Sequence, residues 1–122
     1  MIQKIMVIED DESVAELLNI NLTRRGFQVT SVESGETALD LVFTDPPQLI
    51  LLDIRLPGIS GWEVCRQIRA NPLTRNIHVI ILTAAVQKKD MELAEECGAD
   101  QFLPKPFDIR ILLNMIYSLK QR

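Results

Sequence analysis

The chain has 122 residues, the size of one ordinary domain and too few for two. Hydrophobic residues make up 47% and charged residues 25%, a composition typical of soluble globular proteins and not of disordered, collagen-like or disulfide-stapled chains. The net charge of −4 argues against direct nucleic-acid binding, and the longest apolar runs are far shorter than the ~20 residues that span a bilayer, so we predict a cytoplasmic protein with no membrane segment.

Short apolar runs alternate with helical patterns along the whole chain. In chain order, the sequence predicts a strand over 4–8, a helix ending at Gly26, a strand over 27–30, a helix over 34–44, a strand over 49–52, a helix ending before Asn71, a strand over 79–82, a helix over 87–97, a strand over 101–103 and a helix from 108 to the C-terminus. The first helix carries apolar residues at helical spacing that we expect on its buried face, namely Val14, Leu17, Leu18 and Leu22.

These elements form five strand–helix units, and the strands over 49–52 and 79–82 are apolar at every position. Continuous apolar strands are typical of parallel sheets that are covered on both faces. Right-handed crossovers then place helices on both faces of the sheet. We therefore predict an α/β fold with a doubly wound, five-stranded parallel sheet.

Charged and hydroxyl side chains stand at the ends of four predicted strands. Glu9 and Asp10 follow the first strand, Asp53 the third and Thr83 the fourth, and Lys105 stands just after the fifth. Because the carboxyl ends of parallel strands meet at one edge, we expect these side chains to converge there. Neighbouring carboxylates repel one another unless a cation lies between them, and hard oxygen ligands suit Mg²⁺. A hydroxyl and an ammonium facing that cluster are suited to contact phosphoryl oxygens.

Each of these residues also has a simpler explanation when it is taken alone. The acidic residues at 9–12 could cap the first helix, where an anion is favoured, yet Glu9 and Asp10 lie before its predicted start. Thr83 could be a turn residue, and Lys105 could be a solvated surface charge. The joint placement of all these residues at successive strand ends favours a shared site.

Four short motifs contain these residues. They are Val7-Ile8-Glu9-Asp10-Asp11, Leu51-Leu52-Asp53-Ile54-Arg55-Leu56-Pro57-Gly58, Leu82-Thr83-Ala84, and Lys105-Pro106-Phe107 after Gly98-Ala99-Asp100. Together they resemble the receiver domain of bacterial two-component response regulators, over the entire chain. The resemblance implies the flavodoxin-like strand order 2-1-3-4-5. It also implies one receiver domain over residues 1–122, with no output domain present.

The resemblance assigns roles to the residues at the strand ends. Asp53 would accept a phosphoryl group from a histidine kinase or a histidine phosphotransfer protein, and Thr83 and Lys105 would contact the phosphoryl oxygens. Mg²⁺ would be held by three carboxylates and one backbone carbonyl, those of Glu9, Asp10, Asp53 and Arg55 respectively. Such a protein is a phosphoacceptor that assists its own phosphorylation and dephosphorylation, and it is not an enzyme.

The resemblance further implies a conformational switch. In this family the hydroxyl at Thr83 is coupled to an aromatic residue, here Phe102, and the peptide bond before Pro106 is cis. Phosphorylation would change the surface formed by the helix over 87–97, the strand over 101–103 and the last helix. That surface would then control an output partner or a homodimer.

The last helix carries two apolar rows. The core row at helical spacing consists of Ile109, Leu112, Leu113 and Ile116. Ile111 and Met115 lie on another face, which we expect to be an exposed apolar stripe. It is either scattered surface hydrophobicity or a contact surface for a homodimer or an output partner.

Two other functions use similar residues. A haloacid dehalogenase-type phosphatase also has an aspartate nucleophile at a strand end with Mg²⁺, but it needs a second aspartate two residues on, where this chain has Arg55. A receiver-like module that binds a partner without phosphorylation is the other alternative, and the complete set of Asp53, Thr83 and Lys105 argues against it.

Cys65 and Cys97 are the only cysteines, and they are distant in the sequence. Neither a zinc site nor a disulfide framework is indicated. We predict that both are small buried thiols.

Overall fold

The computed structural model describes residues 2–84 and 87–119, which form a sheet of five parallel strands with helices around it. The strands are β1 (Lys4–Ile8), β2 (Gln28–Val32), β3 (Leu49–Asp53), β4 (His78–Thr83) and β5 (Gln101–Pro104). Their order across the sheet is β2-β1-β3-β4-β5, and each neighbouring pair is parallel. The predicted flavodoxin-like strand order is therefore confirmed.

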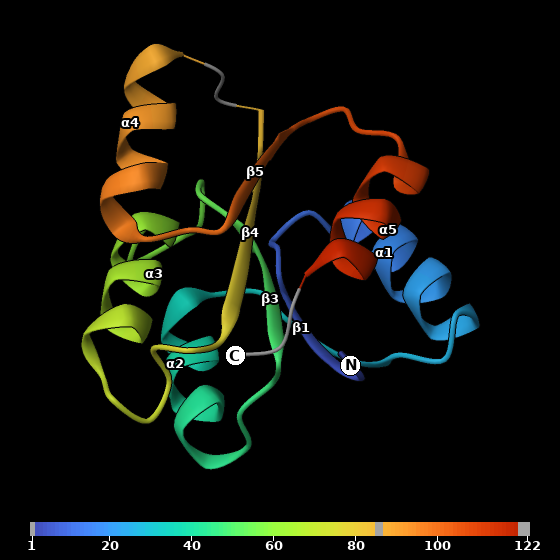
Figure 1. The fold of residues 1–122 in the computed structure, drawn as a ribbon, viewed down its shortest axis with the longest axis horizontal. Helices are drawn as coiled ribbons and strands as arrows, with labels where there is room; N and C mark the ends of the chain where they lie inside the picture. Colours follow the sequence, from blue (N-terminus) through green and yellow to red (C-terminus); the bar gives the residue numbers. More distant parts are fainter. Residues whose placement is uncertain (1, 85–86, 120–122) are drawn as a thin grey trace.

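Helices cover both faces of this sheet (Figure 1). They are α1 (Glu12–Arg24), α2 (Gly35–Thr44), α3 (Gly61–Ala70), α4 (Lys88–Cys97) and α5 (Ile109–Ser118). In Figure 1, α1 and α5 lie on one side of the sheet, whereas α2, α3 and α4 lie on the other. The predicted doubly wound α/β architecture is confirmed. In the described part of the chain, every helix is too short or too polar to cross a membrane.

Short polar side chains define where several helices begin. The carboxylate of Asp11 accepts hydrogen bonds from the backbone N–H groups of Ser13 and Val14, at 2.9 and 3.3 Å. The hydroxyls of Ser34 and Ser60 cap α2 and α3 in the same way. Such caps satisfy N–H groups that have no partner within the helix, and each stabilises it by about 0.5–2 kcal/mol. Asp11 is therefore used as a helix cap, which leaves Glu9 and Asp10 for another purpose.

The core consists of two apolar clusters, one on each face of the sheet. β3 and β4 are buried along their whole lengths. Because side chains alternate along a strand, Leu52 and Ile81 pack in the cluster with α2, α3 and α4, whereas Leu51 and Ile80 pack in the cluster with α1 and α5. Burial of each such side chain stabilises the fold by about 1.5–3 kcal/mol. The two central strands are therefore held rigidly, and so is the edge at which they end.

Four strands, β2 to β5, end later than the sequence pattern predicts, and β2 and β4 differ most. β2 covers Gln28–Val32 instead of 27–30, because its ladder with β1 continues as far as the end of β1. β4 covers His78–Thr83 instead of 79–82, because its first residue pairs with β3 and its last pairs with β5. Pairing with neighbours sets these boundaries, and local apolar character does not.

The buried face of α1 differs from the prediction at one position. Leu18 and Leu22 are fully buried, whereas Leu17 is 48% exposed. Successive residues of an α-helix point about 100° apart, so a helix that packs through Leu18 and Leu22 turns Leu17 away from the core. The expectation that Leu17 belongs to the core is therefore wrong.

The predicted apolar stripe on α5 is only half present. Ile111 is 49% exposed, as expected for a residue off the core face. Met115 instead packs, partly buried, against the cluster beneath α1 and α5. Its long, flexible side chain reaches that cluster although its Cα lies off the core row. The expectation that Met115 forms an exposed stripe with Ile111 is therefore wrong.

Candidate functional site

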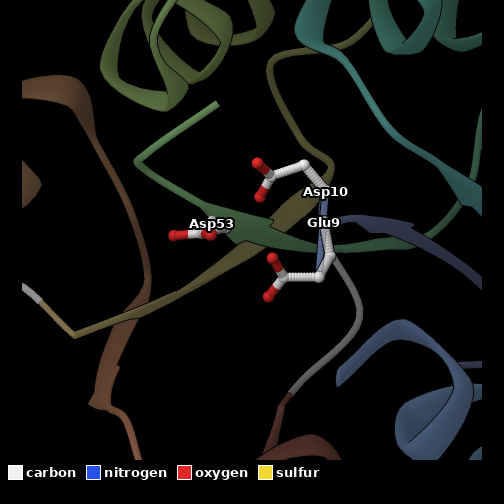
Figure 2. A group of neighbouring side chains, drawn as sticks. All are labelled: Glu9, Asp10 and Asp53. Atoms are coloured by element: carbon white, nitrogen blue, oxygen red, sulfur yellow. The ribbon is translucent and has the colours of Figure 1, made fainter. Parts of the chain in front are cut away.

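Carboxyl groups from two neighbouring strands meet at the carboxyl edge of the sheet. Glu9 and Asp10 follow β1 directly, and Asp53 is the last residue of β3, which pairs with β1. Figure 2 shows the three side chains extending into the same space above the strand ends. One oxygen of each carboxylate lies within 4.8 Å of the others. The sheet topology thus brings together three acidic groups that are far apart in the sequence.

The three carboxyl groups differ in their exposure to water. Glu9 is 3% exposed and Asp53 is 7% exposed, whereas Asp10 is exposed. The pKa of Glu9 is raised from 4.5 to about 7, chiefly by burial. The hydrogen bond from Lys105 lowers this pKa, whereas the nearby Asp53 raises it further. The site therefore holds one carboxyl group that takes up a proton near neutral pH when no cation is bound.

Lys105 supplies the positive charge that faces this cluster. Its ammonium group donates a hydrogen bond to Glu9 and another to Asp53, the latter with a distance of 3.3 Å between Nζ and Oδ2. Burial lowers the pKa of Lys105, but the carboxylates of Glu9 and Asp53 outweigh that effect and raise it overall. The Lys105–Pro106 peptide bond is cis. Lys105 thus stays charged and lies between two of the three carboxyl groups.

Backbone groups hold the two buried carboxylates in place. The N–H of Arg55 donates to Oδ1 of Asp53, and the N–H of Asp11 donates to Oε2 of Glu9, each at 3.2 Å. Close packing also fixes the backbone at the end of β3. A Cβ atom on Gly61, the first residue of α3, would lie 2.5 Å from the carbonyl oxygen of Asp53, so only glycine allows this approach. The sequence alone does not indicate this role of Gly61, because its close contact with Asp53 arises only in the folded chain.

The other predicted site residues lie at or near the same edge. Thr83 is fully buried at the end of β4, and its carbonyl accepts a hydrogen bond of 2.9 Å from the backbone N–H of Lys105. Arg55 is exposed in the loop after β3. Phe102, on β5, is partly buried and packs against the cluster beneath α2, α3 and α4. The structure therefore gathers Glu9, Asp53 and Lys105 in direct contact and leaves Phe102 in the adjoining apolar layer.

The donor set fits a hard divalent cation. Among the residues that the structure describes, three carboxyl groups face one ammonium group, that of Lys105, so negative charge is in excess at this edge. Mg²⁺ binds oxygen ligands, usually one or two carboxylates together with carbonyl groups and water. The buried Asp53 and the exposed Asp10 both offer such oxygens, and Asp10 is open to water. The residues present are therefore compatible with Mg²⁺.

An apolar cavity of about 310 Å³ opens beside Lys105. It is lined by Val14, Leu17, Ala84, Lys105, Pro106 and Phe107. Leu17 contributes to it because its side chain turns away from the core. The sequence carries no signal for this role, since Leu17 follows the same helical spacing as the buried leucines.

Comparison with known proteins places the chain among signalling domains. Residues 5–117 match the family model described as the response regulator receiver domain. A putative response regulator from Chloroflexus aurantiacus is 32% identical, with 95% of each chain covered and a TM-score of 0.90. The signal receiver domain of a signal transduction histidine kinase from Syntrophus aciditrophicus is also 32% identical, with 94% of this chain and 87% of that chain covered and a TM-score of 0.89.

A third solved structure has the same architecture. The BeF3-activated N-terminal receiver domain of RstA from Klebsiella pneumoniae is 29% identical, with 94% of this chain and 96% of that chain covered and a TM-score of 0.87. The family match spans nearly the whole chain, and it agrees with the strand order and with the acidic edge of the sheet. The chain belongs to the response regulator receiver domains of two-component systems.

Proposed function

We propose that Asp53 accepts a phosphoryl group from a phosphorylated histidine of a histidine kinase or a histidine phosphotransfer protein, with Mg²⁺ bound at the same edge. The observation that carries this proposal is the contact of Asp53 and Glu9 with Lys105 at the carboxyl end of the sheet. Receiver domains are generally regarded as phosphoacceptors and not as enzymes in the ordinary sense.

The reaction needs an ionised carboxylate and little covalent help from the protein. An oxygen of Asp53 attacks phosphorus, the bond from phosphorus to the histidine nitrogen breaks, and the electron pair stays on that nitrogen. No general base is needed, because the nucleophile carries no proton. The hydrogen bond from the N–H of Arg55 orients the carboxylate through its Oδ1.

Mg²⁺, when bound, would neutralise charge on the transferred phosphoryl group. The carboxylates of Glu9, Asp10 and Asp53 and the backbone carbonyl of Arg55 would hold it. Lys105, which now pairs with Glu9 and Asp53, would turn its ammonium group to a phosphoryl oxygen, and the Thr83 hydroxyl would donate to another. Ala84, beside Thr83, is small enough to leave room for the incoming group.

Phosphorylation would then change the surface made by α4, β5 and α5. The added negative charge draws Thr83 toward the site, and Phe102 moves into the space that Thr83 leaves. Phe102 packs against the apolar layer next to α4, so its movement alters the surface there. We propose that an output partner or a second copy of the chain reads this change, with Ile111 as one exposed apolar contact.

The donor protein must bring its phosphohistidine to the edge where Asp53 lies. The apolar cavity lined by Leu17 and Phe107 adjoins Lys105 at that edge. We propose that the donor covers this cavity, because burial of exposed apolar surface beside the site would hold the histidine in line. A cytoplasmic location and a single domain over residues 1–122 remain predictions from the sequence.

The proposal is tested by intact mass after incubation with acetyl phosphate and Mg²⁺. We expect a single gain of about 80 Da, the mass of one phosphoryl group, and we expect chelation of Mg²⁺ to abolish it. Asp53→Asn should show no gain, whereas Asp40→Asn, a matched change at an exposed site on α2, should behave like the unaltered chain. A folded chain that gains no mass would contradict the proposal and favour a module that binds partners without phosphorylation.

A further inference from the structure

The two cysteines of the chain lie together between α3 and α4. Cys65, within α3, is fully buried, and Cys97, the last residue of α4, is 7% exposed. The Cys65 thiol donates to the backbone carbonyl of Cys97, and the Cys97 thiol donates to the backbone carbonyl of Ala94, each at 3.3 Å. The prediction that both are buried is confirmed. Their contact was not foreseen, because only the packing of α3 against α4 creates it.

The surroundings make the two thiols chemically unequal. The hydrogen bond to Cys97 and burial both raise the pKa of Cys65. The interaction with the Cys65 side chain lowers the pKa of Cys97. The backbone N–H of Ala99 and the positive charge of Arg69 lower it further, whereas burial raises it. Cys97 is therefore the more acidic of the two thiols.

Of the two cysteines, Cys97 alone lines a cavity between α3 and α4. A cavity of about 290 Å³ opens between α3 and α4, and its wall includes Trp62, Leu93 and Cys97. Cys65 is fully buried and does not line this cavity. A small oxidant that enters the cavity therefore meets the more acidic thiol first.

We propose that Cys97 and Cys65 form a reversible intramolecular disulfide when the chain meets a hydroperoxide. The Cys97 thiolate attacks one peroxide oxygen, the O–O bond breaks, and Cys97 becomes a sulfenic acid while the other oxygen leaves as hydroxide. The Cys65 sulfur then attacks the Cys97 sulfur, and the sulfenic oxygen leaves as water with the Cys65 proton. Two thiols lose two electrons, and hydrogen peroxide is reduced to two molecules of water.

The disulfide would join α3 to α4 at the point where α4 ends. Gly98 follows Cys97 in the left-handed conformation and closes the helix. The crosslink would therefore fix the C-terminal turn of α4, just before the chain enters β5. This inference goes beyond phosphoryl acceptance and does not depend on it, since neither cysteine takes part in the acidic site.

The test is oxidation of the reduced, folded chain by a small molar excess of hydrogen peroxide, followed by alkylation of free thiols in denaturant and mass analysis. We expect a product lighter than the reduced chain by two hydrogen atoms, without alkylation sites, and restored by dithiothreitol. Peptide mapping should show the Cys65 peptide linked to the Cys97 peptide. The yield should not depend on protein concentration, because the bond is intramolecular.

Two matched variants separate the roles of the sulfurs. Cys65→Ser should leave a Cys97 sulfenic acid that dimedone traps, whereas Cys97→Ser should leave Cys65 unmodified at the same peroxide dose. Two thiols that remain free in the treated folded chain, or a disulfide found only between molecules, would overturn the proposal. Equal trapping in both variants would overturn the order of the steps. If either variant fails to fold by circular dichroism, the peptide map of the unaltered chain decides alone.

Discussion

The protonation of Glu9 makes the stability of the metal-free protein depend on pH. Its side chain is 3% exposed, and burial beside Asp53 raises its pKa from 4.5 to about 7. The folded chain therefore holds this proton more tightly than the unfolded chain does. The resulting stabilisation is fully present below about pH 4.5, and it is lost as the pH rises through about 7.

The size of this effect follows from the two pKa values. Each unit of difference corresponds to about 1.4 kcal/mol, so the shift sets a ceiling of about 3 kcal/mol. Between about pH 5.5 and about pH 8, the stabilisation from Glu9 falls by about 2 kcal/mol. Glu9→Gln replaces the carboxyl group with a neutral group of the same shape. It should therefore remove this loss.

The assay is urea unfolding of both proteins at these two pH values, with a chelator present throughout. The free energy of unfolding of the unaltered chain should fall by about 2 kcal/mol more than that of Glu9→Gln over this interval. Other titrating groups act in both proteins, and the comparison cancels them. Added Mg²⁺ should recover stability at the higher pH in the unaltered chain more than in the variant. Parallel pH profiles for the two proteins would show that Glu9 does not cause this pH dependence.

Two further substitutions test the close packing at the end of β3 and the polar contacts of Asp100, just before β5. Gly61→Ala adds a Cβ that would lie 2.5 Å from the Asp53 carbonyl, so the backbone there must shift, and we expect a loss of about 1–3 kcal/mol in urea unfolding together with slower phosphorylation. Unchanged phosphorylation would contradict this. Asp100→Ala removes the ion pair with the partly buried Arg69, 3.0 Å away, and the acceptor for the backbone N–H of Val79, so it should cost about 1–3 kcal/mol. Asp45→Ala, at an exposed ion pair, should cost less than about 1 kcal/mol by the same assay, and equal losses would argue against a larger contribution from Asp100.

The sequence predicts the fold because its local signals agree with one another. The apolar runs at 49–52 and 79–82 are too short for helices and too continuous for a sheet that is exposed on one face. Regular alternation with helices then leaves a parallel sheet, and a parallel sheet brings Asp53 beside Glu9 and Asp10. These steps use only the spacing of apolar residues, the residues that end helices and strands, and the rules of sheet topology. All of this information can be read from the sequence.

The contacts that the sequence does not predict depend on how each helix packs against its neighbours. Local sequence patterns do not determine that packing. Leu17 and Leu18 are the same residue type, yet only Leu18 faces the core, because the rotation of α1 is set by its packing on the sheet. Cys65 and Cys97 meet because α3 lies against α4. In the same way, the pairing of Lys105 with Glu9 depends on how the ends of β1 and β5 are positioned relative to each other. The order of the motifs along the chain does not predict that position.

The proposed role of Asp53 is tested most directly by locating the phosphoryl group in the unaltered chain. Reduction of the acetyl phosphate-treated protein with borohydride converts an aspartyl phosphate to homoserine, which peptide mass analysis assigns to one position. We predict homoserine at position 53 alone, formed only when Mg²⁺ is present during phosphorylation. Homoserine at Asp10, or phosphate retained on a residue other than aspartate, would contradict it.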